Sequence, residues 1–414
     1  MYRIRQEFDG THVSDPEQST RDALVKLPLS GRVQPGESVA ITVGSRGIAN
    51  ISAITRAIVS TVRDLGGVPI IIPAMGSHGG ATAEGQTAML ATLGVTPESV
   101  GAEIRSSMET VVVATTAQGI PVHFDRHAYE ADHVIVAGRI KPHTMFTGDI
   151  ESGLHKMMLI GLGNHTGAKI YHRAITNYSF GTIIQSVAEQ VLKKCKILAG
   201  VAILENANDE TALIDAVLPQ DFYQREKELL QLAQEWLPRL PFPEADLLIV
   251  DRIGKNISGS GMDSNVIGRK FNDHVALPGE RARCTRIFVR SLTPETNGNA
   301  LGIGLAEFTT QRAISQINLE YTRINCITAG HPTAGMIPLV YPNDRAAITD
   351  ALSTIGLTEP ADARVIQISD TLHLAETLVS ESLIKNNPLV GKQVLAGPFP
   401  MDFDEQGQLA DVRG

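Results

Sequence analysis

Residues 38–75 read SVAITVGSRGIANISAITRAIVSTVRDLGGVPIIIPAM. The apolar, β-branched runs at 38–45 and 68–75 predict two buried strands, and the 3.6-residue periodicity over 51–65 predicts a helix between them. A strand, a helix and a second strand in this order form a βαβ unit, which places parallel strands side by side in one sheet. The stretch therefore predicts an α/β fold with a mainly parallel sheet.

The same alternation continues along the first half of the chain. Further strands are expected at 133–138 and 197–205, and further helices at 83–93 and 180–194. Short strands flank Gln118-Gly119, which indicates a hairpin beside the main sheet.

The length of 414 residues exceeds the roughly 250–300 at which a single hydrophobic core stops growing, so we expect two domains. A charged helix over 221–237 runs into Pro238-Arg-Leu-Pro-Phe-Pro243, and these three prolines stop a helix and stiffen a connection. We place the first domain at residues 1–240 and a second α/β domain at 245–394. The strand-like tail, 395–414, is a candidate for rejoining the first domain.

The second domain shows its own pattern of elements. Strands are expected at 246–250, 286–292 and 364–368, and helices at 307–317, 344–355 and 372–384. The strand-like segment of the tail is 394–403.

The composition excludes several classes of protein. A net charge of −9 gives no general attraction to nucleic acid, and no apolar run approaches the ~20 residues of a membrane span. The N-terminus lacks the apolar segment of a secretory signal. Cys195, Cys284 and Cys326 are widely spaced without a CxxC pair, which argues against disulfides and a thiolate zinc site. We expect a cytoplasmic protein that binds neither nucleic acid nor membrane.

Histidines gather in less than a quarter of the chain. Eight of the 12 lie between residues 78 and 172. Arg46, His78 and His143 each follow a predicted strand, and ligands of open α/β sheets bind beyond the carboxyl ends of the strands. Arginine grips carboxylates bidentately and histidine titrates near neutral pH, so together they predict a carboxylate clamp with an acid/base pair.

The stretch GLHKMMLIGLG, residues 153–163, places Lys156 in an apolar, glycine-bounded segment. Such a lysine either extends to the surface or is held inside for chemistry, because desolvated lysines form covalent adducts. His172 follows sixteen residues later, with His165 between them. Imidazoles without thiolate partners suit Zn, Cu, Fe or Ni.

These residues form an ordered set that resembles the nickel-pincer-nucleotide lactate racemase family. The set consists of Arg46, GSHG at 76–79, GRIKPH at 138–143, GLHK at 153–156, His172 and GSGMDSN at 259–265. The order and nearly all the spacings agree over most of the chain.

The resemblance implies an isomerase of the racemase or epimerase type, acting on a small-molecule 2-hydroxy acid. It implies a nickel-pincer nucleotide (the pyridinium-3-thioamide-5-thiocarboxylic acid mononucleotide nickel complex) tethered to Lys156, with His172 as the protein's nickel ligand and His165 as the weaker candidate. His78 and His143 would exchange the proton of the C2 hydroxyl while hydride passes reversibly between C2 and the cofactor.

The resemblance assigns the remaining site residues as well. Arg46 would bind the substrate carboxylate and contribute to the cofactor site, which Asp263 and Asn265 complete. The N-terminal domain would then hold the cofactor and the catalytic residues, and the C-terminal domain would close over an active-site cleft between the two. A homo-oligomer is compatible with the sequence.

Departures from the lactate enzymes point to another substrate. Val43 and Gly79-Gly80 stand where those enzymes carry an aspartate and Arg-Pro, and Gly268, Arg269 and Lys270 stand where they carry a glutamine and a lysine. A glycine in place of glutamine predicts more space, with Arg269 and Lys270 binding the substrate. We therefore expect a 2-hydroxy acid larger or more polar than lactate, such as a sugar acid or a dicarboxylate.

Two other functions fit the same residues. Lys156 could form a Schiff base in a metal-independent lyase or aldolase, with His78 or His143 as the base. Alternatively, the chain could be a non-catalytic nucleotide or metabolite binder whose Gly-rich stretch at 254–265 cradles a phosphate, although it lacks a standard phosphate-loop spacing.

Overall fold

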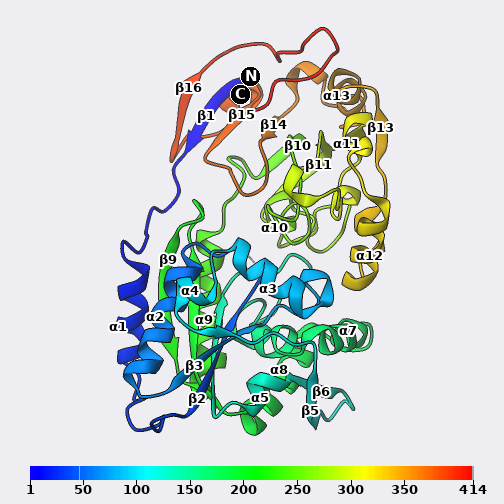
Figure 1. Cartoon of the computed structure of the whole chain (residues 1–414). Coiled ribbons are helices and arrows are strands. Elements are labelled where there is room, and N and C mark those ends of the chain that lie inside the picture. Colours follow the sequence, from blue (N-terminus) through cyan, green and yellow to red (C-terminus); the bar gives the residue numbers. More distant parts are fainter. Residues whose placement is uncertain (46, 413–414) are drawn as a thin grey trace. The chain divides into compact units, whose positions relative to one another are not determined.

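The computed structural model describes residues 1–45 and 47–412, which divide into two compact units (Figure 1). The N-terminal unit comprises Gly10–His143 and Thr147–Trp236, and the C-terminal unit comprises Met1–Asp9, Thr144–Phe146 and Leu237–Gly414. The chain thus passes from the N-terminal unit to the main part of the C-terminal unit beside Pro238. The described part of the tail 395–414 belongs to the C-terminal unit and does not rejoin the first domain.

The N-terminal unit is built on a six-stranded sheet. Its strands lie in the order β4 (Glu103–Ile104), β3 (Val68–Pro73), β2 (Ser38–Val43), β7 (His133–Arg139), β8 (Ile197–Glu205) and β9 (Thr211–Val217). All neighbours are parallel except β8 and β9. A separate antiparallel hairpin joins β5 (Thr110–Thr115) to β6 (Pro121–Asp125).

Helices cover this sheet. They are α1 (Pro16–Val25), α2 (Ile51–Asp64), α3 (Ala83–Thr92), α4 (Pro97–Val100), α5 (Arg126–Glu130), α6 (Leu154–Lys156), α7 (Asn164–Ala174), α8 (Phe180–Lys194) and α9 (Phe222–Trp236). The unit also contains short 3-10 turns at Gly79–Ala81 and Pro219–Asp221 and a π-helical turn at Met157–Gly161. Figure 1 shows α1 and α2, in blue, running along one side of the sheet.

The buried strand β2 shows why both faces are covered. Val39, Ile41 and Val43 point to the core that the apolar face of α2 shares, and the residues between them are buried as well. On the other face the Thr42 hydroxyl accepts a hydrogen bond from Ala137 N at 2.9 Å, which satisfies a polar group inside the sheet. A strand buried on both faces is typical of parallel sheets.

The C-terminal unit contains an eight-stranded sheet. Its order is β13 (Leu339–Tyr341), β12 (Phe308–Thr310), β11 (Arg283–Val289), β10 (Glu244–Val250), β14 (Val365–Ile368), β15 (Glu376–Val379), β1 (Tyr2–Gln6) and β16 (Lys392–Ala396). The five strands from β13 to β14 are parallel, and the last three pair antiparallel. Figure 1 shows β1 and β16, from opposite ends of the chain, side by side.

The helices of this unit are shorter. They are α10 (Ser264–Ile267), α11 (Gln311–Ser315), α12 (Leu319–Ala329), α13 (Asp344–Leu352) and α14 (Glu381–Asn386). The predicted α/β class with mainly parallel sheets is confirmed.

Two predicted helices are wrong in their first halves. The segment 307–317 begins with β12, because Phe308 pairs with Phe288 of β11 and Leu339 of β13, and only then continues into α11. The segment 372–384 contains β15, which lies between β14 and β1. In both places a short buried strand has the apolar spacing of a helical turn, and partners far along the chain decide the structure.

A buried ionic cluster fastens the carboxyl ends of β10 and β11. Asp251 and Arg290 directly follow these strands, and Arg290 donates to Asp251 at 2.5 Å, to Asp344 at 2.9 Å and to Asp411 at 2.7 Å. Arg290, Asp251 and Asp344 are each at most 2% exposed. The guanidinium therefore contacts two fully buried carboxylates and the half-buried Asp411, while Arg312 also pairs with Asp344 and Arg252 with Asp411.

We predict that Arg290→Met lowers the free energy of unfolding by about 3–5 kcal/mol, because it leaves the buried carboxylate of Asp251 without its counter-charge. Urea unfolding of the purified chain measures the change. The matched control is Arg105→Met, which removes an exposed arginine paired with Glu103 and should alter stability little. Equal losses in the two variants would contradict the importance of the cluster.

Candidate active site

Three loops follow parallel strands of the N-terminal sheet and therefore emerge at one edge. Ser45 follows β2, His78 follows β3, and His143 follows β7. A hydrogen bond between the Ser45 hydroxyl and Nδ1 of His78 shows that the first two loops meet. His78, which is half-buried, thus has its ring orientation fixed by a neighbouring strand's loop.

The His78 loop also contacts the segment that carries Lys156. A Cβ on Gly76, where φ is +61°, would approach Cγ2 of Ile160 at 3.1 Å. The buried Gln86 holds this loop by donating from Nε2 to the Gly76 carbonyl oxygen at 3.0 Å. At Gly79 a Cβ would lie 2.6 Å from the backbone nitrogen of Gln86, so glycine is required there for packing.

The π-helical turn directly after Lys156 lies over the strand ends. A Cβ on Gly138, in β7, would lie 2.7 Å from Cγ of Met157, and a Cβ on Gly161 would lie 2.9 Å from the carbonyl oxygen of Ala74, next to β3. Glycines at these points let the turn reach the backbone of the sheet. Single π-helical turns inside helices are frequent at functional sites.

Lys156 and His172 are electrostatically coupled. Lys156 is half-buried, and its Nζ donates to the Ser152 hydroxyl at 3.3 Å. Burial lowers the pKa of His172 on α7, and the positive charge of Lys156 lowers that pKa further. The lowered pKa favours the neutral imidazole of His172, which is the form that ligates metals. His165, on the same helix, is exposed, which favours His172 over it as a ligand.

His143 is positioned by a carboxylate and an aromatic ring. Its backbone nitrogen donates to Oε2 of Glu151 at 2.6 Å, and Glu151 is 1% exposed. The imidazole stacks on Phe180, the first residue of α8, with ring centroids 6.2 Å apart and planes at 24°. The sequence predicted neither contact, because neither Glu151 nor Phe180 belongs to a recognisable motif.

A buried pair under the Lys156 segment is a further contribution that sequence reasoning missed. Glu226 of α9 accepts from the backbone nitrogen of His155 at 3.1 Å and bonds Nδ1 of the same residue at 2.8 Å. Glu226 and His155 are 1% and 3% exposed. At Gly153 an added Cβ would lie 2.3 Å from Oε1 of Glu226, so the turn into α6 requires glycine. In the sequence, the only indication of this buried pair is that the carboxylate of Glu226 falls on the apolar face of a charged helix.

Residues expected to complete the site from the C-terminal unit lie around α10. Asp263 is buried and caps this helix, accepting from Asn265 N at 3.0 Å and from Asn265 Nδ2 at 2.8 Å. Lys270 is half-buried, and its backbone nitrogen donates to Glu280 at 2.9 Å. The side chains of Asp263 and Asn265 therefore also shape their own loop.

The structure assigns other roles to Gly268 and Arg269 than the sequence predicted. Gly268 has φ +69°, and a Cβ there would lie 1.9 Å from the carbonyl oxygen of Ala282, so the glycine is required by the backbone and opens no space. Arg269 is 2% exposed and donates to the carbonyl oxygen of Cys284 at 2.8 Å and to Glu307 at 3.3 Å. It stabilises the interior of the C-terminal unit. Arg46, the predicted carboxylate clamp, lies outside the described residues.

Comparison with known families identifies the segment that carries these loops. Residues 10–181 match the family model of the lactate racemase N-terminal domain. Over this segment, which is less than half of the chain, the protein is a homologue of the lactate racemase family. The match includes the positions of His78, His143, Lys156 and His172, and this homology supports a racemase or epimerase type of activity.

Two solved structures resemble this lactate racemase homologue. One is the lactate racemase apoprotein from Thermoanaerobacterium thermosaccharolyticum, with a TM-score of 0.49 at 15% identity over 88% of this chain and 94% of that one. The other is a protein from Thermotoga maritima, with a TM-score of 0.51 at 11% identity over 89% and 99%. The second likeness shows a shared fold. No curated protein sequence matches the chain.

Some properties of the homologue follow directly from the described residues. Within residues 1–45 and 47–412, no group of three or more His, Cys, Asp or Glu side chains is placed to hold a metal ion. The same part of the chain has no helix with the length and apolar character needed to span a bilayer. All three cysteines are buried as free thiols.

We predict that Glu226→Ala lowers the free energy of unfolding by about 1–3 kcal/mol, because two buried N–H groups of His155 lose their acceptor. Chemical denaturation monitored by the single tryptophan, Trp236, measures the loss. The control Glu228→Ala removes an exposed carboxylate from the same helix and should have little effect. A Glu226→Ala variant as stable as this control would contradict the anchoring role.

Proposed function

We propose that this lactate racemase homologue is a racemase or epimerase that inverts C2 of a 2-hydroxy acid larger or more polar than lactate. The observation that carries the proposal is that the half-buried Lys156 lies near enough to His172 to lower its pKa, beside the sheet edge where the loops of His78 and His143 also emerge. The expected cleft between the two domains stays a prediction.

The cofactor that the family implies fits these residues. Lys156 offers the amine that would tether a nickel-pincer nucleotide, and His172 offers one neutral imidazole as the nickel ligand. When bound, this group supplies an acceptor for hydride. Conversion of the lysine amine to a thioamide would remove the positive charge that now acts on His172, and burial would then remain as the cause that favours the neutral imidazole.

His78 and His143 would move the proton of the substrate hydroxyl. They extend from loops after two different strands, and each enantiomer presents its hydroxyl to a different side, so two bases are needed. The Ser45 contact orients the ring of His78, and Phe180 orients that of His143. Each imidazole would accept the hydroxyl proton from one enantiomer and return it to form the other.

The remaining assignments are part of the same proposal. Arg46 would hold the substrate carboxylate, Lys270 would contact polar groups of a larger acid, and Asp263 with Asn265 would contact the cofactor. Because Gly268 opens no space and Arg269 is buried, the preference for a larger acid rests on the other departures, namely Gly79-Gly80 and Lys270.

We predict that protein produced together with a cofactor-synthesis pathway and nickel carries a covalent adduct of several hundred daltons on Lys156. Intact-mass and peptide mass spectrometry measure it independently of activity. Lys156→Arg should carry no adduct, whereas the control Lys169→Arg, at an exposed position on α7, should carry it. An unmodified Lys156 in nickel-replete protein would exclude the tether and favour the Schiff-base lyase.

We predict that His78→Ala and His143→Ala keep the Lys156 adduct but lose about 10²–10⁴-fold of the rate at which a pure enantiomer loses its optical purity. A panel of sugar acids, dicarboxylic hydroxy acids and lactate serves as substrates, with chiral chromatography as the readout. The control His127→Ala, which replaces a histidine on α5, should retain full activity. Unchanged rates in both test variants would indicate a non-catalytic binder.

A further inference from the structure

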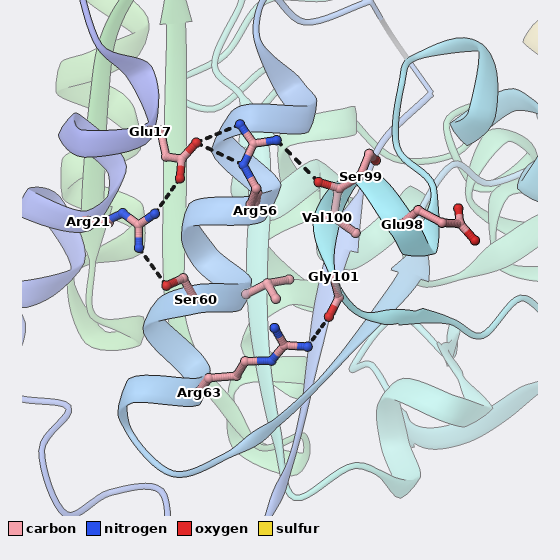
Figure 2. Close-up of a pocket in the computed structure, with 10 residues that line it drawn as sticks. Glu17, Arg21, Arg56, Ser60, Arg63, Glu98, Ser99, Val100 and Gly101 are labelled. Atoms are coloured by element: carbon pink, nitrogen blue, oxygen red, sulfur yellow. Dashed lines mark hydrogen bonds and ion pairs between the residues drawn. The ribbon is translucent and has the colours of Figure 1, made fainter.

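A concave site lies on the helices of the N-terminal unit. It is a pocket of about 310 Å³ between α1, α2 and the segment around α4, lined by three arginines (Figure 2). We call it the arginine pocket, and its polar side chains are Arg21, Arg56, Arg63, Ser60, Ser99, Glu17 and Glu98. Its volume lies at the lower end of the range for small-molecule sites, which fits a small metabolite.

Helical spacing explains why these side chains converge. Arg56, Ser60 and Arg63 stand at i, i+4 and i+7 of α2 and therefore share one face of that helix. Arg21 reaches this face from α1, and its Nη1 donates to the Ser60 hydroxyl at 2.6 Å. The pocket is thus formed by elements that the fold already holds together.

The positive charge in the pocket is only partly balanced. Glu17 accepts from Arg56 at 2.7 and 3.0 Å and also from Arg21, so one carboxylate serves two guanidiniums. Arg63 donates to the carbonyl oxygen of Gly101, and a guanidinium carries five N–H donors in total. Figure 2 shows the carboxylate of Glu98 directed away from the three arginines.

Arg63 is therefore a cation that no carboxylate neutralises among the residues described around the pocket. This surplus is local, since the chain as a whole carries a net charge of −9. Arginine donors placed at several angles around a small concavity match the oxygens of a phosphate group, because each guanidinium can give two parallel hydrogen bonds.

We propose that the arginine pocket binds a small anion through a phosphate group. The site is separate from the candidate active site: α2 begins at the sheet edge where His78 lies and runs back along the sheet, and Arg63 stands one residue before its end. The proposal does not depend on the cofactor or on the racemase activity.

Isothermal titration calorimetry of the full chain tests the proposal, with pyrophosphate, inorganic phosphate and glycerol 3-phosphate as probes at constant ionic strength. We expect saturable binding of pyrophosphate that Arg63→Gln and Arg21→Gln each weaken about tenfold or more, because each removes charge-assisted hydrogen bonds. Tighter binding of the phosphate monoester than of inorganic phosphate would indicate an organic ligand, and the reverse would indicate the free anion.

The matched control is Arg126→Gln. It removes an exposed arginine of α5 that lies outside the pocket and pairs with Glu109. It should bind pyrophosphate as the wild type does. Absence of binding to the wild type at millimolar concentrations overturns the proposal. Equal affinities of Arg63→Gln and Arg126→Gln do so as well, because they would show that only overall charge matters.

Discussion

The turn from Gly153 to Gly161 depends on one buried carboxylate. Glu226 holds the backbone and the ring of His155 from below, and Lys156 is the next residue. The same turn then continues as a π-helical segment over the strand ends, where glycines replace side chains that would collide with Met157 and Ala74. The position of the lysine is therefore fixed by packing on both sides, and the histidine loops meet an element that cannot move freely.

This arrangement explains how an ordinary α/β sheet can carry an unusual set of groups. Parallel strands bring the loops after β2, β3 and β7 to one edge, as in other open sheets. The chain then adds a lysine and, near it, an imidazole whose pKa is lowered by burial first and by the lysine charge second. A neutral imidazole and an amine in one half-buried place suit a metal-bearing cofactor that is covalently held. A site that used only a catalytic pair of histidines would need neither this additional imidazole nor the amine.

The sequence predicted the repeating elements well and the local exceptions badly. Apolar periodicity predicted the strands at 38–43, 68–73 and 197–205 and the helices at 51–64 and 180–194. The strands are buried on both faces, and the helices are buried along one continuous stripe. The strands β12 and β15 were missed, because three or four buried residues fit either period and their pairing partners are distant in sequence. Family resemblance supplied the proposed site residues, which stay a prediction, and the departures from the family gave Gly268 and Arg269 roles that their backbone conformation and burial do not support. Glu226 and Glu151 act through positions that only the folded chain creates.

The central claim is that His172 is the protein's nickel ligand beside a lysine-tethered cofactor. Nickel K-edge X-ray absorption on the loaded protein tests it most directly, through the scattering of a coordinated imidazole. The account predicts that this signal is present in the wild type and in His165→Ala and is lost in His172→Ala. An imidazole signal that persists in His172→Ala, or that disappears in His165→Ala, would contradict it.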